Sequence, residues 1–241
     1  MKSIDLILSP ALIPVYPSPE RGTVYVVADI LRASTTIVTA FRNGVRAVYP
    51  LETVEEAEQK AREGRLVGAE RNVQRLPFAR FGNDPFEYTE EAVRGQEIYF
   101  TTTNGTRTIK ACYKADPEAV VVVGAFSNLS AVADFCRDKA VYAVAAGWKG
   151  KVSLEDALFG AALCDRLRET HAPASDALRM ILPLYESGSL LNLVRTKADH
   201  YERLVKGDKL ASLEYCLTPD TCPVVPVAAI DPVTNELVLR L

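Results

Sequence analysis

Histidine is scarce in this chain of 241 residues, which contains only two, His171 and His200. His171 follows the end of an expected helix and His200 lies in a charged helical stretch. We therefore expect both side chains to be exposed, without a role as base or metal ligand. Their scarcity disfavours a Ser-His-Asp triad, a histidine-dependent phosphatase and a zinc site built on histidines.

The five cysteines form no Cys-x-x-Cys pair, and none is followed by arginine six positions later. This spacing offers no support for a metal-binding or redox pair and rules out the Cys-x5-Arg loop of cysteine-dependent phosphatases. We expect reduced, mostly buried thiols. A Gly-x-Gly-x-x-Gly motif after a strand is also missing, which disfavours a dinucleotide enzyme.

A large excess of charge of either sign is missing as well. The chain has 28 Lys and Arg and 31 Asp and Glu, which gives a formal net charge of -3. Nucleic acid and anionic membranes are therefore not expected partners. No apolar run approaches the roughly 20 residues that span a bilayer. The first ten residues carry Asp5 inside a short apolar segment, which predicts a strand rather than a signal peptide. A cytoplasmic location is expected.

The chain does contain four units in which an apolar strand runs into a polar loop and then a helix. In each unit hydroxyls, amides, glycines or single charges stand where the strand ends. In open α/β sheets ligands bind beyond the carboxyl ends of the strands, and helix N-termini attract anions. The pattern predicts an α/β fold with a pocket for a small, highly charged anion. The four units span residues 24–36, 97–107, 119–128 and 141–151.

The rest of the chain also alternates helices and strands. Strands are expected at 47–49 and 66–69, and a long loop at 71–88. The final segment, from Cys222, predicts a hairpin at a sheet edge, because its prolines suit an edge better than a centre. No low-complexity linker divides the chain, which predicts a single domain over residues 1–241. Helices are expected at 31–43, 53–63, 89–93, 154–167, 175–187 and 189–206.

Three segments place carboxylates near the expected pocket. Asp29 ends the apolar strand of the first unit, and Glu70 follows the strand at 66–69. Glu155 and Asp156 begin a helix, where neighbours point about 100° apart, so one can face the pocket while the other caps the helix. Together they predict a Mg²⁺ site, which typically uses few protein carboxylates plus water and phosphate oxygens. Alternatively, Asp29 caps a turn and Glu70 forms a surface ion pair.

The second unit carries the sharpest local motif. Thr103 or Asn104 can cap the following helix, and Gly105 allows a ligand to approach the backbone closely. Arg107 can donate a pair of hydrogen bonds to phosphate or another oxyanion. The alternative is an ordinary helix cap followed by a surface arginine.

The other units repeat this logic more weakly. Ser127 and Asn128 end the third unit. In the fourth, Lys149 lies between Gly147 and Gly150 and Lys151 follows Gly150, and we expect one of the two lysines to face solvent. Arg32 lies directly beyond the first strand. Several arginines and lysines thus fall on or beside these loops, which suits a ligand with more than one anionic group.

Six segments in order resemble the 2-phosphosulfolactate phosphatase family. The resemblance covers residues 24 to about 163, and the segments 201–203 (YER) and 222–226 (CPVVP) are similar but less specific. The six segments are DILRASTT (29–36), GAER (68–71), FGNDPFE (81–87), TTTNGTR (101–107), GAFSN (124–128) and AGWKGKVSLED (146–156).

The resemblance implies a Mg²⁺-dependent acid phosphatase that converts 2-phosphosulfolactate to 3-sulfolactate and phosphate, a step of coenzyme M biosynthesis. It also implies a three-layer α/β/α fold with a mixed, largely parallel sheet. The expected partner is then a small anionic phosphate ester. A homodimer is left open.

On this hypothesis Mg²⁺ is held by Asp29, Glu70 and Glu155 or Asp156. Arg107 and the backbone of residues 103–105 hold the phosphoryl oxygens, and Arg32 with the loop cations recognises carboxylate and sulfonate. The residues assigned to catalysis are Asp29, Arg32, Arg107 and Glu155, and those assigned to substrate binding are Thr103, Asn104, Gly105, Ser127, Asn128 and Lys149.

Two alternatives to this hypothesis stay open. One is a haloacid-dehalogenase-type phosphatase with Asp29 as nucleophile, although Leu31 stands where that family has a second Asp. The other is a non-catalytic module that binds phosphate esters or other anions on the same scaffold. Whether water or Asp29 attacks the phosphorus is also left open.

Overall fold

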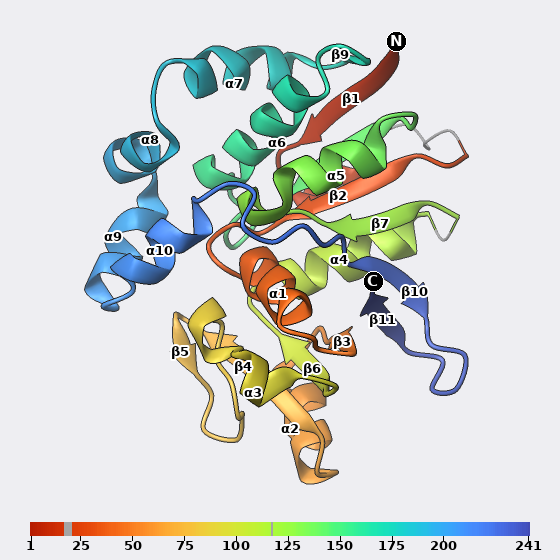
Figure 1. Ribbon diagram of the computed structural model, residues 1–241, viewed down its shortest axis with the longest axis vertical. Helices are drawn as coiled ribbons and strands as arrows, with labels where there is room; N and C mark the ends of the chain where they lie inside the picture. Colours follow the sequence, from red (N-terminus) through yellow and green to blue (C-terminus); the bar gives the residue numbers. More distant parts are fainter. Residues whose placement is uncertain (17–20, 117) are drawn as a thin grey trace.

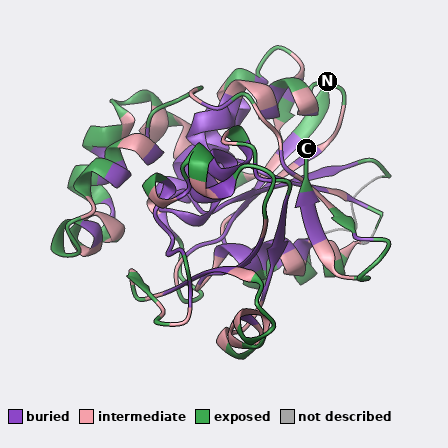
Figure 2. Cartoon of the chain, turned by 60° about the horizontal axis from the view of Figure 1, so that its bottom comes forward, coloured by how far each residue is buried: buried purple, intermediate pink, exposed green. Residues whose placement is uncertain are grey.

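The computed structural model describes residues 1–16, 21–116 and 118–241, and one mixed sheet runs through it (Figure 1). Apolar strands form most of its interior, and Figure 2 shows buried residues concentrated along them. From one edge to the other the strands are β5 (Gln74–Arg75), β4 (Leu66–Arg71), β6 (Glu97–Thr101), β3 (Ala47–Pro50), β11 (Leu237–Arg240), β10 (Val227–Ile230), β7 (Val120–Val123), β2 (Val24–Ala28), β8 (Val141–Ala145), β1 (Lys2–Ile7) and β9 (His171–Pro173).

The sheet consists of two parallel groups joined by an antiparallel hairpin. Strands β4, β6 and β3 form one parallel group, and β7, β2, β8, β1 and β9 form the other. Strands β10 and β11 lie between them and pair antiparallel with β7 and β3. The expected α/β fold with a mixed, largely parallel sheet is confirmed.

The position expected for the C-terminal hairpin was wrong, because it lies in the centre of the sheet. Its prolines do not prevent this. Pro223 and Pro226 precede β10, and Pro232 lies in the turn, so both strands keep every N–H needed for pairing.

Helices cover both faces of the sheet, with α5 in front of β2 and α4 behind β7 in Figure 1. Three short 3-10 turns add to them, at Pro10–Val15, Pro85–Glu87 and Phe126–Asn128. The helices are α1 (Ala33–Arg42), α2 (Val54–Arg62), α3 (Glu90–Val93), α4 (Gly105–Ala115), α5 (Leu129–Cys136), α6 (Leu154–Arg166), α7 (Asp176–Glu186), α8 (Leu190–Lys197), α9 (Asp199–Lys206) and α10 (Leu210–Cys216). None of these helices is long and apolar enough to cross a membrane.

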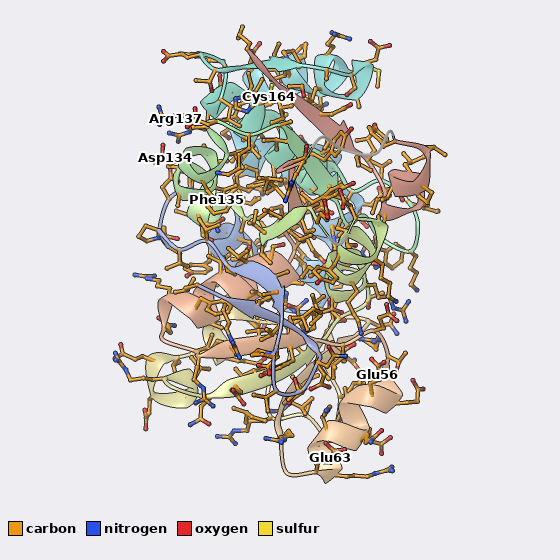
Figure 3. All side chains as sticks on the ribbon, turned by 90° about the vertical axis from the view of Figure 1, so that its right-hand side faces the viewer. Glu56, Glu63, Asp134, Phe135, Arg137 and Cys164 are labelled. Carbon is orange, nitrogen blue, oxygen red and sulfur yellow. The ribbon has the colours of Figure 1, made fainter. Side chains whose placement is uncertain are left out.

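Side-chain capping starts three of the helices, α2, α7 and α8. Thr53 accepts a hydrogen bond from the Glu56 N–H while the Glu56 carboxylate accepts one from the Thr53 N–H, a capping box that starts α2. Figure 3 shows Glu56 and Glu63 at the two ends of this helix. The helix expected at 189–206 is instead two helices, because Ala198 has an extended backbone with ψ of 127°.

Buried polar and thiol groups sit mostly outside the pocket. All five cysteines are buried and free, as expected. The expectation that His171 is exposed was wrong, because its side chain is 1% exposed. Its Nε2 lies 2.7 Å from the Lys139 carbonyl oxygen and its Nδ1 2.8 Å from the Thr170 hydroxyl, so the ring serves the packing of β9.

Candidate active site

A cavity of about 430 Å³ lies where several strand ends meet α9. Asp29 follows β2, Glu70 is next to last in β4, and Trp148 follows β8. Strands from both parallel groups therefore direct their carboxyl ends to one cavity, although antiparallel ladders separate the groups. The lining residues are Asp29, Leu31, Arg32, Glu70, Asn72, Val73, Gln74, Asn83, Thr102, Thr103, Asn104, Trp148, His200, Arg203, Leu204, Lys206 and Gly207.

Asp29 is the carboxylate at the end of β2 and is only 7% exposed. Its backbone is fixed by Ser34, whose hydroxyl accepts the Asp29 N–H at 2.9 Å and whose N–H donates to the Asp29 carbonyl. Burial raises the pKa of Asp29 to about 6, with the nearby charges of Glu70 and Glu155 adding to the shift and His200 opposing it. A cation in the cavity would relieve this unfavourable charge.

Glu70 is equally buried and lines the same cavity. Its Oε1 accepts the Val73 N–H at 2.6 Å, which fixes the turn after β4. The expected alternative, a surface ion pair with Arg71, does not form, since the Arg71 guanidinium donates instead to the Glu70 carbonyl and the Thr101 hydroxyl. Glu70 therefore stands beside Asp29 as the second cavity carboxylate.

Glu155 and Asp156 are both buried but have different tasks. The two Asp156 oxygens accept the N–H groups of Ile30 and Gly147 at 2.8 and 2.9 Å, and so tie the loops after β2 and β8 together. Burial raises the pKa of Asp156 well above its usual value, and the charges of Glu155 and Asp29 add to this. Asp156 thus does not cap α6, which was one of the two roles left open for it, and its oxygens are engaged by backbone N–H groups.

The Glu155 carboxylate contacts a residue that the sequence interpretation set aside. Its Oε1 lies 2.7 Å from Nδ1 of His200, whose ring lines the cavity. The expectation of an exposed His200 without a place at the site was wrong. α9 brings the ring over the start of α6, a contact between residues 45 positions apart.

Arg32 is 3% exposed and held by fixed partners. Its Nη1 donates to Asp84 Oδ2 at 3.0 Å and to the Ser212 hydroxyl at 3.2 Å. Lys209 Nζ lies 3.0 Å from the same carboxylate oxygen. Burial would raise the pKa of Asp84, but Arg32 and Lys209 together hold it below its usual value. The network fixes the Arg32 side chain at the cavity wall.

The start of α4 forms another wall through Thr103 and Asn104. The Asn104 side chain makes no capping bond, and its Oδ1 accepts the Lys149 N–H at 3.3 Å. Gly105 packs directly on Asp29, since a Cβ there would lie 2.8 Å from Asp29 Oδ2 and 2.7 Å from the Ala33 Cβ. Only glycine fits this approach.

Seven residues assigned to the site from the sequence do not line the cavity: Gly105, Glu155 and Asp156, whose contacts are given above, and Arg107, Lys149, Ser127 and Asn128. Arg107 is exposed and donates through Nε to the Glu52 carbonyl at 3.0 Å. Lys149 is exposed, with Nζ 4.6 Å from the centre of the Trp148 ring. Ser127 and Asn128 are buried elsewhere, in the 3-10 turn after β7.

The helices after β9 supply cavity residues that the sequence interpretation did not assign. Arg203 and Lys206 reach it from α9, and the Arg203 guanidinium lies 3.9 Å over the Trp148 ring. The weak family resemblance at residues 201–203 was the available signal for Arg203.

A model of the 2-phosphosulpholactate phosphatase family matches residues 7–230, a range that contains every residue lining the cavity. The chain belongs to the 2-phosphosulfolactate phosphatase family. The expected family and its enzyme class, the phosphoric monoester hydrolases, are therefore confirmed.

Relatives named probable 2-phosphosulfolactate phosphatase are similar over most of their length. One from Thermotoga petrophila is 35% identical over 225 residues, covering 92% of this chain and 94% of the relative. One from Gloeobacter violaceus is 36% identical over 208 residues, covering 83% and 86%. One from Synechocystis is 33% identical over 230 residues, covering 90% and 92%.

Proposed function

We propose that this member of the 2-phosphosulfolactate phosphatase family uses Mg²⁺ to hydrolyse 2-phosphosulfolactate, or a similar phosphorylated hydroxy acid, to 3-sulfolactate and phosphate. The product would then enter coenzyme M biosynthesis. The observation that carries the proposal is the buried Asp29 beside Glu70, in a cavity that also holds Arg32, Arg203 and the start of α4. Carboxylates and cations in one cavity suit a metal-assisted reaction of an anionic ester.

The carboxylates fit Mg²⁺ rather than a metal with a closed protein cage. Within the described ranges no three His, Cys, Asp or Glu side chains form a ready metal cluster. Mg²⁺ is commonly held by one or two carboxylates, with water and substrate phosphate completing its shell. Asp29 and Glu70 meet this requirement, whereas Asp156 is engaged by backbone N–H groups and Glu155 by His200.

The bound ion would supply positive charge to the phosphoryl oxygens. The chain would supply the remaining contacts. The Asn104 side chain does not cap α4, and the Thr106 N–H is engaged by Thr102 Oγ1 at a long 3.5 Å, so N–H groups of the first turn can donate to the phosphoryl oxygens. Arg32, fixed by Asp84 and Ser212, adds a positive charge that does not need to reorganise.

Water is the nucleophile in this proposal. A haloacid-dehalogenase-type enzyme would use Asp29 for attack and a second Asp two positions later, but Leu31 is apolar and 5% exposed. Attack by water leaves no covalent intermediate. Stoichiometric trapping of Asp29 by beryllofluoride would instead support attack by its carboxylate.

A phosphate-release screen over phosphorylated hydroxy acids, with and without Mg²⁺, tests the proposal. We expect release from 2-phosphosulfolactate that EDTA abolishes, and a loss of about 100-fold or more in kcat/KM for Asp29→Asn. Asp138→Asn, on an exposed loop, is the matched control.

Each result of this screen has a separate meaning. An Asp29→Asn rate within a few-fold of wild type would reject the central assignment. Release only from esters without sulfonate would keep the reaction class and reject the named substrate. Tight ester binding without any release, even with Mg²⁺, would identify a binding module instead of an enzyme.

A further inference from the structure

The wall of the cavity formed by α9 carries an arginine stacked on an aromatic ring. The Arg203 guanidinium carbon lies 3.9 Å from the centre of the Trp148 ring, and both residues line the cavity. Such stacking holds the planar guanidinium in one orientation while its edge stays available for hydrogen bonds. The pair joins α9 to the loop after β8.

The charge of Arg203 is not balanced by a neighbouring carboxylate. Arg32 is paired with Asp84 at 3.0 Å, and Lys206 with Glu202 at 3.6 Å. No carboxylate in the described part of the chain forms an ion pair with Arg203, and its Nε is buried without a hydrogen-bond partner. A buried donor left unpaired is unfavourable, so a ligand that accepts a hydrogen bond from it would be favoured.

A second polar group on the same cavity is also without a partner. Asn83 is 7% exposed, and its side-chain oxygen is buried without a hydrogen bond in the described structure. A side-chain amide can turn to offer either its oxygen or its NH₂ group. Two buried, unpartnered groups on one cavity indicate polar recognition beyond the Asp29 end.

We propose that Arg203, held by Trp148, determines specificity by binding an acidic group of the substrate other than its phosphoryl group. This inference rests on the proposed function, which places the phosphoryl group at Asp29 and the start of α4. A phosphorylated hydroxy acid carries a carboxylate, and in the named substrate also a sulfonate. The guanidinium fork matches the paired oxygens of either group.

The position of α9 supports this division of the cavity. Gly207, directly after α9, lies close to the turn that follows β4. A Cβ added at Gly207 would lie 3.3 Å from Val73 Cγ1. Residues 72–74 and α9 thus form a wall distinct from the loops that follow β2 and β6. An acidic group extending from the phosphoryl site toward this wall meets Arg203.

Steady-state kinetics of Arg203→Gln and Arg203→Lys test the proposal on two substrates. We expect Arg203→Gln to raise KM for 2-phosphosulfolactate by roughly 10- to 100-fold with kcat within about threefold, and to leave KM for phenyl phosphate, which has no second acid, nearly unchanged. Arg203→Lys should keep part of the affinity, since it keeps the charge and loses the fork. Arg195→Gln, exposed on α8, removes the same charge outside the cavity and should change neither KM.

Binding experiments make the test independent of turnover. Trp148 is the sole tryptophan, so its fluorescence reports on the Arg203 wall alone. Fluorescence titration measures the binding of 3-sulfolactate and of inorganic phosphate to wild type and Arg203→Lys, and calorimetry measures the same two ligands with Arg203→Gln. We expect Arg203→Gln to bind 3-sulfolactate about tenfold or more weakly than wild type does. Its affinity for phosphate should change little. Thermal unfolding of each variant verifies that it is folded.

Equal weakening of both ligands would make Arg203 a phosphoryl-binding residue and overturn the proposal. Unchanged affinity for sulfolactate, or no binding of it by wild type, would overturn it as well. Failure of the proposed function is seen separately, as absence of phosphate release from every ester in the screen.

Discussion

The buried carboxylate of Asp29 makes the stability of the folded protein depend on pH. Its folded-state pKa is about 6, compared with an ordinary value of 3.8. Because the folded state holds the proton more tightly, Asp29 favours the folded state at low pH, and this contribution is lost as pH rises from about 4 to 6. A shift of this size corresponds to about 3 kcal/mol.

Asp29→Asn should therefore be more stable than wild type above pH 6 in EDTA, by about 3 kcal/mol, while the two proteins unfold alike near pH 4. Urea denaturation at several pH values measures this. Mg²⁺ should then raise the unfolding midpoint of wild type and not that of the variant. Parallel pH dependence in the two proteins would contradict a raised Asp29 pKa, and Asp138→Asn provides the exposed control.

Gly105 offers a second prediction at a single residue. The Cβ of Gly105→Ala would meet Asp29 Oδ2 at 2.8 Å and Ala33 Cβ at 2.7 Å, so Asp29 must move. We expect kcat/KM to fall about 100-fold and stability by roughly 1–3 kcal/mol. Gly188→Ala, with no atom within 4 Å of its added Cβ, is the control. Normal kinetics of Gly105→Ala, measured on the same esters, would show that the Asp29 position is not critical.

Some of these residues could be predicted from local order in the sequence. Asp29 and Glu70 end apolar strands, and strand ends meet at one edge of a parallel group. Arg107 does not reach the cavity although it belongs to the same motif as Gly105. It lies two positions after Gly105, which rotates its side chain by about 200° around the axis of α4, to the exposed side. His200 and Arg203 depend on how α9 packs, which no local pattern specifies.

At the scale of elements, the third strand-loop-helix unit shows how one motif can serve the fold instead of the cavity. Asn128 Oδ1 accepts the Ala125 N–H at 2.8 Å, and its Nδ2 donates to the carbonyls of Val123 and Val224 at 3.1 and 2.8 Å. The side chain thus ties the end of β7 to the segment that leads into β10.

Asn128→Ala should lose about 3 kcal/mol of unfolding free energy, since three hydrogen bonds of a buried side chain are removed. KM for the phosphate ester should stay within about twofold, because the side chain lies outside the cavity. Asn192→Ala, exposed on α8, is the matched control. A raised KM with unchanged stability would return Asn128 to the substrate-binding role first assigned to it.

Helix starts could be predicted from the sequence where a capping residue was present, as at Thr53. The break at Ala198 had no such signal. The segment 189–206 is uniformly helical in composition, and the bend between α8 and α9 arises because α9 packs toward the cavity, where Leu204 is 1% exposed. Tertiary packing outweighed local propensity there.

At the scale of the whole molecule, the central hairpin connects the two parallel groups. The sequence identified the hairpin but not its place, because strand order depends on pairing between distant segments. Neighbouring residues of β11 contribute to different cores. Leu239 belongs to the large core, and Val238 belongs to the smaller one with Ala47, Tyr49 and Tyr99.

Strand β11 contributes side chains to both cores. A substitution that destabilises β11 should therefore also destabilise the parallel group of β7, β2, β8, β1 and β9. Val238→Asp places a charge where the side chain is fully buried, at a cost of several kcal/mol against a total stability of roughly 5–15 kcal/mol. We expect its urea transition to shift to much lower concentration, with Trp148 fluorescence and far-UV circular dichroism changing together. Val233→Asp, in the hairpin turn and 90% exposed, should match wild type. A Trp148 transition that stays at the wild-type midpoint would show that the second parallel group folds independently, against the prediction of one domain over residues 1–241.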